Sequence, residues 1–177
     1  MEFYMSAHYE IERKFLVEIP DIGRLDLKRQ LHIRQTYLKK GENGSQRRVR
    51  SINEDGITSY TYTEKVFVTH ITREENEYEI NEARYHELLG ERDTELMPVV
   101  KTRYCFNYAE QLFELDVYPY SDRLAIMELE LADPEQIIDF PPFVNVLKDV
   151  SDDSRYSNAN LASAGAFPDE RNGEVGQ

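Results

Sequence analysis

The residues best suited to chemistry lie near the start of the chain, in the segment Glu10-Ile11-Glu12-Arg13-Lys14. Side chains of a β-strand alternate between its two faces, so Glu10, Glu12 and Lys14 share one face. Two neighbouring carboxylates repel each other and are costly to bury alone. A hard divalent cation prefers oxygen ligands and would offset that cost. The segment therefore predicts a metal-binding strand face, with a lysine within reach of a metal-bound anion.

Similar charged faces recur in other segments of strand-like composition. Like charges lie two residues apart in Arg48/Arg50, Lys101/Arg103, Glu114/Asp116, Glu128/Glu130 and the triplet Glu75/Glu77/Glu79. A single such pair is typical of the solvated face of an antiparallel sheet. The whole set, with both signs of charge, favours a closed sheet whose charged residues line a polar lumen and whose apolar residues pack outward.

Eight runs rich in Tyr, Thr, Val, Ile and Phe have the composition of β-strands. They cover residues 8–17, 31–40, 46–53, 57–68, 74–80, 98–107, 111–119 and 124–132. Turn signals at residues 41–44 and 53–56 indicate hairpins, so antiparallel pairing is expected. The sequence thus predicts a mainly β (α+β) fold, an eight-stranded antiparallel β-barrel tunnel with a few peripheral helices.

The segments between and after these strands favour helices and loops. Residues 81–93 predict a short helix capped by Asn81, and residues 22–30 predict another. Residues 134–139 predict a helical turn that begins at Pro134, and residues 143–162 a mixture of helix and loop. We expect one domain over residues 6–162 and a polar, disordered tail over residues 163–177.

Charge and cysteine content restrict the partners and the compartment. A net charge of −13 argues against a nucleic-acid polymer or an anionic membrane as partner, because proteins that bind these usually carry a basic surface. A small polyanion stays compatible, since a local cationic pocket with bound metal outweighs the global charge at short range. Cys105 is the only cysteine, so an intrachain disulfide is impossible, and a reducing, cytoplasmic setting is expected. The sequence also has no run of about 18 apolar residues that would predict a membrane span.

The charged motifs, in order from about residue 8 to residue 162, resemble those of the CYTH superfamily, also called triphosphate tunnel metalloenzymes. The resemblance rests on Glu10-x-Glu12-x-Lys14, Gln35-Thr36-Tyr37-Leu38, Arg48-x-Arg50, Thr63-x-Lys65, Arg73-x-Glu75-x-Glu77, Lys101-x-Arg103, Glu114-x-Asp116, Glu128-x-Glu130 and residues 152–158. It implies an eight-stranded tunnel that acts on triphosphate-containing substrates with Mg²⁺ or Mn²⁺, and it points to the bacterial-type inorganic triphosphatases.

The resemblance also implies roles for individual residues. Metal ions are expected on Glu10, Glu12, Glu128 and Glu130, and catalysis is expected from Lys14, Glu12 and Glu130. The triphosphate is expected to bind Arg48, Arg50, Lys65, Lys101 and Arg103, with Arg73 and Arg155 as further cations, because Arg and Lys suit phosphate oxygens. Supporting carboxylates on Glu75, Glu77, Glu79, Glu114 and Asp116 would orient these cations. Tyr156 and Asn158 would belong to a C-terminal plug that closes one end of the tunnel.

Several activities are compatible with these motifs. The density of charge favours hydrolysis of inorganic tripolyphosphate to pyrophosphate and phosphate. A nucleoside triphosphatase or a class IV adenylyl cyclase is an alternative, with Tyr37, Tyr60 or Tyr62 available to stack on a base. Thiamine triphosphatase is a further one. A non-enzymatic polyphosphate-binding module would not need the metal carboxylates, which are present here. The expected partner is thus a small polyanion, and the oligomeric state is open.

Overall fold

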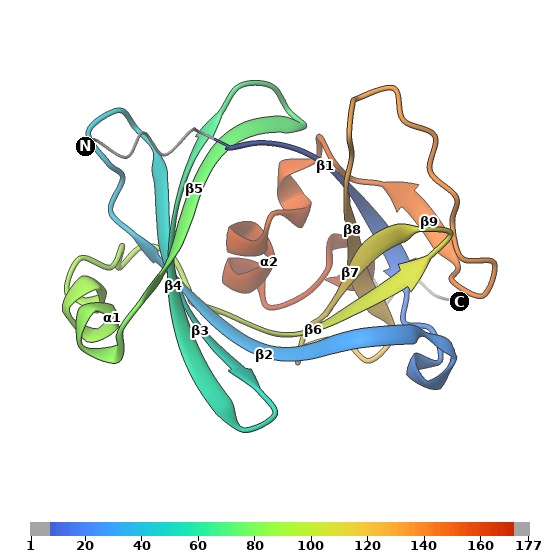
Figure 1. Cartoon of the computed structure of the whole chain (residues 1–177), viewed down its shortest axis with the longest axis horizontal. Coiled ribbons are helices and arrows are strands. Elements are labelled where there is room, and N and C mark those ends of the chain that lie inside the picture. The colour runs from blue at the N-terminus through green and yellow to red at the C-terminus, as the bar shows by residue number, and fades with distance from the viewer. Residues whose placement is uncertain (1–7, 172–177) are drawn as a thin grey trace.

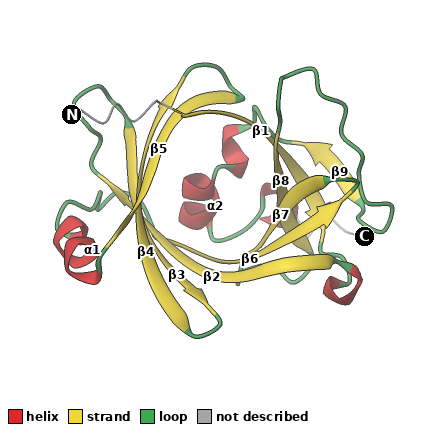
Figure 2. Ribbon diagram, in the orientation of Figure 1, coloured by secondary structure: helices red, strands yellow, loops and turns green. Residues whose placement is uncertain are grey.

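The computed structural model describes residues 8–171 and shows a closed antiparallel β-barrel (Figures 1 and 2). The strands of its wall are β1 (His8–Glu18), β2 (Asp26–Leu38), β3 (Gln46–Glu54), β4 (Ile57–Phe67), β5 (Thr72–Ile80), β6 (Val99–Tyr108), β7 (Gln111–Val117) and β8 (Leu124–Glu130). They follow the order β5-β4-β3-β2-β6-β7-β8-β1, and pairing of β1 with β5 closes the ring. The predicted eight-stranded barrel is therefore confirmed.

Tight turns account for the antiparallel order of neighbouring strands. Between β3 and β4, Asp55 and Gly56 have φ angles of 52° and 81°. Two successive positive φ angles suit the twist of a hairpin, and glycine adopts such an angle at little cost. Between β6 and β7, Ala109 and Glu110 also have positive φ angles, 50° and 59°, although neither is glycine. The first turn was predicted from the sequence, whereas the second contains no glycine that would indicate a turn.

Strand β1 changes its neighbour along its length. Its first part pairs with β5, ending where Ile11 lies opposite Thr72. Its later part pairs with a ninth strand, β9 (Val146–Asp149), beginning where Phe15 lies opposite Asp149. Strand β8 occupies the other edge of β1 from residue 12 to residue 18. Residues 13 and 14 therefore lie between the end of one neighbour and the start of the next.

The inner face of the barrel is charged over one half and apolar over the other. On β1, Lys14 is followed on the same face by buried Leu16, and on β8 Glu128 is preceded by buried Ile126. One apolar cluster joins these two residues to the C-terminal side chains Tyr156, Leu161 and Phe167. Helix α2 (Asn158–Ala164) belongs to this segment and is seen inside the ring of strands in Figure 1. The C-terminal segment thus fills one end of the barrel.

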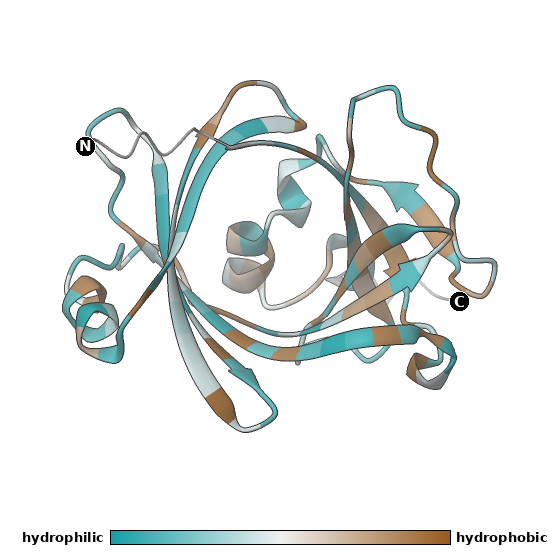
Figure 3. Cartoon of the chain, in the orientation of Figure 1, coloured by the Kyte–Doolittle hydropathy of each residue, from teal (hydrophilic) through white to brown (hydrophobic). Residues whose placement is uncertain are grey.

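A second apolar core lies on the outer face of the barrel. Phe15 and Met127 point to this side, because they alternate with the charged residues of β1 and β8. They form one cluster with Phe106, Phe113, Leu25 and Val144. Figure 3 shows the same alternation of hydrophilic and hydrophobic residues along the strands. Apolar packing outside the barrel therefore leaves the charged half of the interior free for chemistry.

The helix predicted over residues 81–93 is confirmed, but it is shorter than predicted. Helix α1 spans Glu82–Leu89, and the side chain of Asn81 caps it by accepting a hydrogen bond of 2.8 Å from the Arg84 amide. Tyr85 and Leu88 are buried against residues of β2, β3 and β4. The helix covers the outside of the barrel, away from the lumen.

One predicted helix is wrong, and one predicted helical turn is present only as a short non-helical turn. Residues 22–30 contain only a single 3-10 turn, η1 (Ile22–Arg24), and β2 already begins at Asp26 because its backbone pairs with β6 from there. Residues 134–139 form a turn without a helix. There the Ala132 and Glu135 amides donate to the side chains of Gln136 and Asp133, which compete with helical hydrogen bonds.

The C-terminal segment is more ordered than predicted. Residues 143–162 include the unexpected strand β9, the 3-10 turn η2 (Ser154–Tyr156) and most of α2. Residues 163 and 164 complete α2, and α3 (Pro168–Arg171) follows after the fully buried Phe167. The expectation of disorder is therefore wrong for residues 163–171, and residues 172–177 lie outside the described part. Within residues 8–171, no helix has the length and apolar character needed to cross a membrane.

Candidate active site

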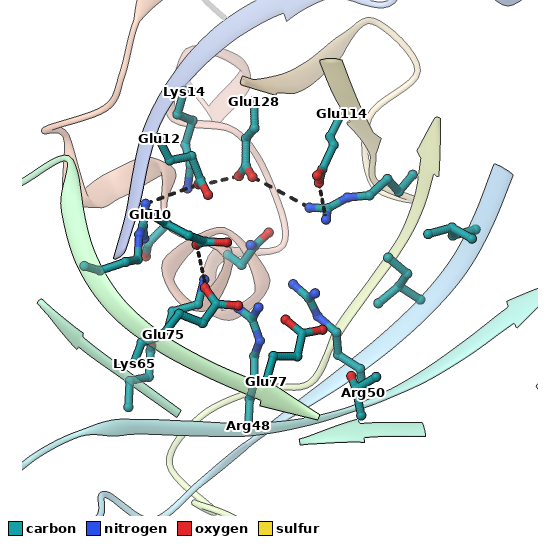
Figure 4. A pocket seen from close by; sticks show the side chains of 18 of the residues that line it. Glu10, Glu12, Lys14, Arg48, Arg50, Lys65, Glu75, Glu77, Glu114 and Glu128 are labelled. Atoms are coloured by element: carbon teal, nitrogen blue, oxygen red, sulfur yellow. Dashed lines mark ion pairs between the residues drawn. The ribbon is translucent and has the colours of Figure 1, made fainter. Parts of the chain in front are cut away.

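A cavity of about 980 Å³ occupies the charged half of the barrel. Each of the eight wall strands contributes to its lining, and residues 150–154 and 157–159 form its floor. Figure 4 shows the charged side chains converging from opposite walls. Of the predicted site residues, the cavity brings together Glu10, Glu12, Lys14, Arg48, Arg50, Lys65, Arg73, Arg103 and Glu128. Segments far apart in sequence thus meet in one space, as the alternating charges predicted.

Strands β1 and β8 supply the carboxylates on one side of the cavity. Glu12 lies opposite Glu130 in the strand register, and Lys14 lies opposite Glu128. The Lys14 Nζ is 3.6 Å from Oε1 of Glu128. Arg73 on β5 reaches across the β1–β5 seam, where its Nη2 is 3.2 Å from Oε1 of Glu12. Each carboxylate of this wall that lines the cavity therefore faces at least one cation.

These cations do not neutralise the wall completely. Burial, together with a hydrogen bond with Glu75, raises the pKa of Glu10 to about 8. Burial also raises the pKa of Glu12, and the charge of Glu128 adds to the rise. Burial would raise the pKa of Glu128 as well, but the charges of Lys14 and Arg103 hold it well below its usual range. The wall therefore contains one firmly ionised carboxylate and two that resist ionisation.

Lys65 on β4 links Glu10 to the carboxylates of β5. Its Nζ is 3.0 Å from Oε2 of Glu75 and 3.8 Å from Oε2 of Glu10. Against the effect of burial, the proton held by Glu10 and the charge of Lys65 lower the pKa of Glu75. Burial raises the pKa of Glu77, which also bonds to Glu75. Glu75 thus acts as the ionised partner of Lys65, the supporting role that we expected.

Two arginines of β3 form the opposite wall. Arg50 donates from Nε to Oε1 of Gln35 at 2.8 Å, and Gln35 donates from Nε2 to the hydroxyl of Tyr37 at 3.1 Å. Burial, with the like charge of Arg48, lowers the pKa of Arg50 to about 10, so it remains charged at neutral pH. The Nε of Arg48 is buried and has no hydrogen-bond partner among the described residues. It can donate to an anion in the cavity.

Lys101 does not line the cavity, contrary to its predicted role as a phosphate ligand. Its Nζ lies 2.6 Å from Oδ2 of Asp116, and both side chains are fully buried. Burial lowers the pKa of Lys101 to about 7, although the charge of Asp116 opposes this effect. Arg103 also pairs with Asp116 and additionally contacts Glu114 and Glu128. Asp116 therefore holds Arg103 at the cavity and retains Lys101 behind it.

Two other predicted residues lie outside the cavity lining. Glu130 is exposed, although it lies opposite Glu12 in the register. Arg155 is 61% exposed in its side chain and pairs with Asp153 at 2.6 Å. Its neighbours on the floor, Asp153 and Asn158, do line the cavity. Because Arg155 projects from the short turn η2, its sequence proximity to the floor does not bring its charge inside.

Sequence reasoning missed two parts of the lining. Leu31, Ile33 and Ile52 form an apolar area together with Cys105. Their alternation on β2 and β3 could have indicated it, but apolar residues were assigned only to the outer face. The second part is Ser151, which joins the floor to β1. Nothing in the sequence near Ser151 marks it, because strand β9 was not predicted.

The carboxylate wall fits an open site for a divalent metal ion. Among residues 8–171, no three Asp, Glu, His or Cys side chains converge into a closed metal site. Mg²⁺ needs only one or two protein carboxylates when phosphate oxygens and water complete its shell. Glu10 and Glu12 suit it because burial raises their pKa values, a cost of ionisation that a bound cation would offset. In addition, Oε2 of Glu10 is buried without a hydrogen-bond partner among the described residues. Glu128 lies across the same wall.

Comparisons with known proteins agree with this arrangement. The model of the CYTH domain family matches residues 8–140. The crystal structure of the inorganic triphosphatase NE1496 is 32% identical, with a TM-score of 0.53, over 86% of this chain and 93% of its own. The PH1819 protein from Pyrococcus horikoshii OT3 is 19% identical, with a TM-score of 0.53, over 71% of this chain and 80% of its own, and shares the fold. No curated protein matches the chain. The family match and the NE1496 likeness show that this chain belongs to the CYTH domain family.

Proposed function

We propose that the protein is a divalent-metal-dependent triphosphatase, and that inorganic tripolyphosphate is its substrate. The observation that carries the proposal is the convergence of basic and acidic walls in one cavity of about 980 Å³. A compact polyanion can contact both walls at once, directly on the basic side and through metal on the acidic side. The 32% identity to a protein described as an inorganic triphosphatase supports the same choice.

The charge balance of the lining is the reason to propose a metal. Eight Lys and Arg residues line the cavity, against nine Asp and Glu residues. Tripolyphosphate adds about four to five negative charges at neutral pH, because each terminal phosphate has a pKa near 6. Six of these eight cations already pair with carboxylates, so the substrate benefits from additional positive charge. Mg²⁺ or Mn²⁺ held by Glu10, Glu12 and Glu128 would supply charge neutralisation on the phosphate oxygens.

The remaining lining residues can bind and orient the substrate. Arg48 and Arg50 offer forked donors to phosphate oxygens from one wall, while Lys65 and Arg73 approach from β4 and β5. Arg103 is held in place by Asp116 and faces the cavity above it. Phosphoryl transfer depends mostly on such positioning and charge stabilisation. These arginines and lysines would fix the chain of three phosphates in a single orientation.

Lys14 is the proposed catalytic residue. Its ammonium group is mostly buried and, within the described residues, forms a single ion pair, with Glu128 at 3.6 Å. This loose contact leaves its donors available for a phosphate oxygen. From there Lys14 can stabilise the charge that develops on the transferred phosphoryl group or donate a proton to the leaving phosphate. Glu12 beside it is the candidate to orient the attacking water and accept its proton.

An organic triphosphate is the second candidate substrate. The apolar lining of Leu31, Ile33 and Ile52 would hold a base or another organic group beside the phosphate contacts. A nucleoside triphosphatase, a thiamine triphosphatase or a class IV adenylyl cyclase would each use such a surface. Bare tripolyphosphate has no group that benefits from it. A comparison of turnover between tripolyphosphate and organic triphosphates therefore decides which candidate is the substrate.

A phosphate-release panel distinguishes these activities. Purified protein is incubated with Mg²⁺ or Mn²⁺ and tripolyphosphate, ATP or thiamine triphosphate, and the ATP reaction is also assayed for pyrophosphate and cyclic AMP. We expect the highest kcat/KM with tripolyphosphate and no release in excess EDTA. Faster turnover of ATP than of tripolyphosphate would reverse the ranking. Tight binding of all substrates without any release would leave a polyphosphate-binding module as the function.

A further inference from the structure

The backbone amide of Lys14 bonds to a side chain rather than to a neighbouring strand. Glu12 still belongs to the β1–β5 seam, where its amide donates to the Ile71 carbonyl at 3.0 Å. Two residues later, the Lys14 amide donates to the hydroxyl oxygen of Ser151 at 2.9 Å. The Lys14 carbonyl accepts from the Val150 amide at 2.9 Å. The Ser151 hydroxyl thus takes the place of a backbone carbonyl at the gap between β5 and β9.

The Ser151 hydroxyl is itself fixed by its surroundings. It donates to Oδ1 of Asp149 at 2.6 Å, and the Ser151 amide donates to the same oxygen at 2.9 Å. Arg13 forms an ion pair with Oδ2 of Asp149, and its Nε donates to the Ser151 oxygen at 3.3 Å. The hydroxyl also lies 3.3 Å from the Lys14 carbonyl, but its contact with Asp149 is much shorter and charge-assisted, so the proton favours Asp149 and a lone pair is left for the Lys14 amide. Its orientation therefore does not depend on solvent.

This arrangement determines how Lys14 meets Glu128. Both backbone groups of Lys14 are directed to residues 150 and 151, so neither bonds to β8. Lys14 and Glu128 are therefore a non-hydrogen-bonded pair of the antiparallel ladder, the kind whose side chains lie closer together. A loss of the Ser151 bond would free the Lys14 amide in the gap between β5 and β9 and leave the Val150 bond alone to hold the Lys14 backbone on that side. The ammonium group would then lose its fixed approach to the cavity.

We propose that Ser151 is a positioning residue for Lys14. This inference rests on the proposed triphosphatase function for its kinetic consequence, and on the hydrogen bonds for its geometry. The segment that carries Ser151 lies beyond residues 8–140, the part matched by the family model. The proposal therefore concerns a contribution of the C-terminal segment of this chain to the reaction, in addition to its role as the floor of the cavity.

The test compares Ser151→Ala with Ser151→Thr, which retains the hydroxyl. A matched control is Ser163→Ala, which removes the hydroxyl of an exposed serine on α2 of the same segment. With tripolyphosphate and Mg²⁺, Ser151→Ala should lower kcat about tenfold, because Lys14 loses one hydrogen bond that positions it, with little change in KM. Ser151→Thr should recover most of kcat, and Ser163→Ala should match the parent protein. In a Lys14→Ala background, Ser151→Ala should have no further effect on the residual kcat.

If Ser151→Ala lowered kcat by the same factor in the parent protein and in the Lys14→Ala background, the proposal would be wrong, because Ser151 would then act independently of Lys14. A kcat within twofold of the parent protein would also overturn it. Hydrogen exchange of the Lys14 amide separates this outcome from a failure of the proposed function. That amide should exchange faster in Ser151→Ala than in Ser151→Thr, whether or not the protein hydrolyses any triphosphate. Equal exchange in the two variants would refute the geometry itself.

Discussion

Arg103 and Asp116 meet in a two-point ion pair beneath the cavity, with Nε 2.7 Å from Oδ1 and Nη2 2.9 Å from Oδ2. Asp116 is fully buried and also receives Lys101. Against the effect of burial, the charges of Arg103 and Lys101 hold the pKa of Asp116 below its usual range. One carboxylate thus compensates two cations from β6, only one of which reaches the cavity.

Asp116→Asn should destabilise the fold strongly. Removing one partner of a buried ion pair leaves uncompensated charge and typically costs about 3–5 kcal/mol. Urea unfolding should show this loss in the free energy of unfolding. The matched control is Glu114→Gln, which removes a half-exposed carboxylate from the same arginine and should cost less than about 1 kcal/mol. Equal losses in the two variants would contradict the assignment of Asp116 as the principal partner.

Lys14→Ala should reduce turnover far more than stability. Losing a positioned acid or charge stabiliser typically lowers kcat about 10²- to 10⁴-fold. The free energy of unfolding should change much less than turnover, because Arg103 remains 3.7 Å from Glu128 as a second cation. Phosphate release and urea unfolding measure the two effects, with Lys40→Ala as an exposed control. Unchanged turnover in Lys14→Ala would contradict the proposed catalytic role of this residue.

Arg48→Ala and Arg155→Ala distinguish the cavity from the surface around it. Arg48 lines the cavity with a buried, unpaired Nε, so its loss removes a charge-assisted bond to phosphate. The KM for tripolyphosphate should rise roughly 10- to 100-fold, in line with about 1.5–3 kcal/mol for such a bond. Arg155 is exposed and pairs with Asp153, so its removal should leave KM unchanged. A comparable rise in both variants would restore the role that the sequence suggested for Arg155.

Glu10 should make the metal-free protein less stable as pH rises. Its pKa is about 8 in the fold and near 4.5 in an unfolded chain, so the folded protein binds more protons between these values. The stability it contributes is complete below about pH 4.5 and is lost as pH rises through about 8. In EDTA, Tm should fall between about pH 5 and pH 8, and less so in Glu10→Gln. Added Mg²⁺ should recover Tm mainly at the higher pH; recovery equal at both would argue against Glu10 as a metal ligand.

Alternation made the barrel and most of the lumen predictable from sequence. A charge at every second residue of β1 and β3 fixes which side of each strand faces inward, and the closed ring then brings Glu10 and Arg48 to one cavity. Periodicity says nothing about depth along the barrel axis. Lys101 and Arg103 alternate correctly, yet only Arg103 reaches the cavity, because Asp116 retains Lys101. Glu130 also follows the alternation, and its exposure likewise reflects its position along the barrel axis.

The C-terminal segment was harder to predict because its structure depends on the barrel. The four-residue strand β9 exists only because the edge of β1 is free beyond Lys14. Phe167 is buried against Tyr118, Tyr120 and apolar residues of the barrel interior rather than by its local sequence. In polar sequence with Gly and Pro, such long-range contacts leave no periodic signal. The same reason explains why Ser151 was missed.

The packing of Tyr156, Leu161 and Phe167 into one end of the barrel has a kinetic consequence. A tunnel filled at one end works as a blind chamber, so substrate enters and both products leave through the opening opposite the floor. In a triphosphatase built this way, whichever product lies nearer the opening has to depart before the other. The fragment deeper in the chamber then delays the next turnover, and its identity reveals the direction in which the polyanion enters.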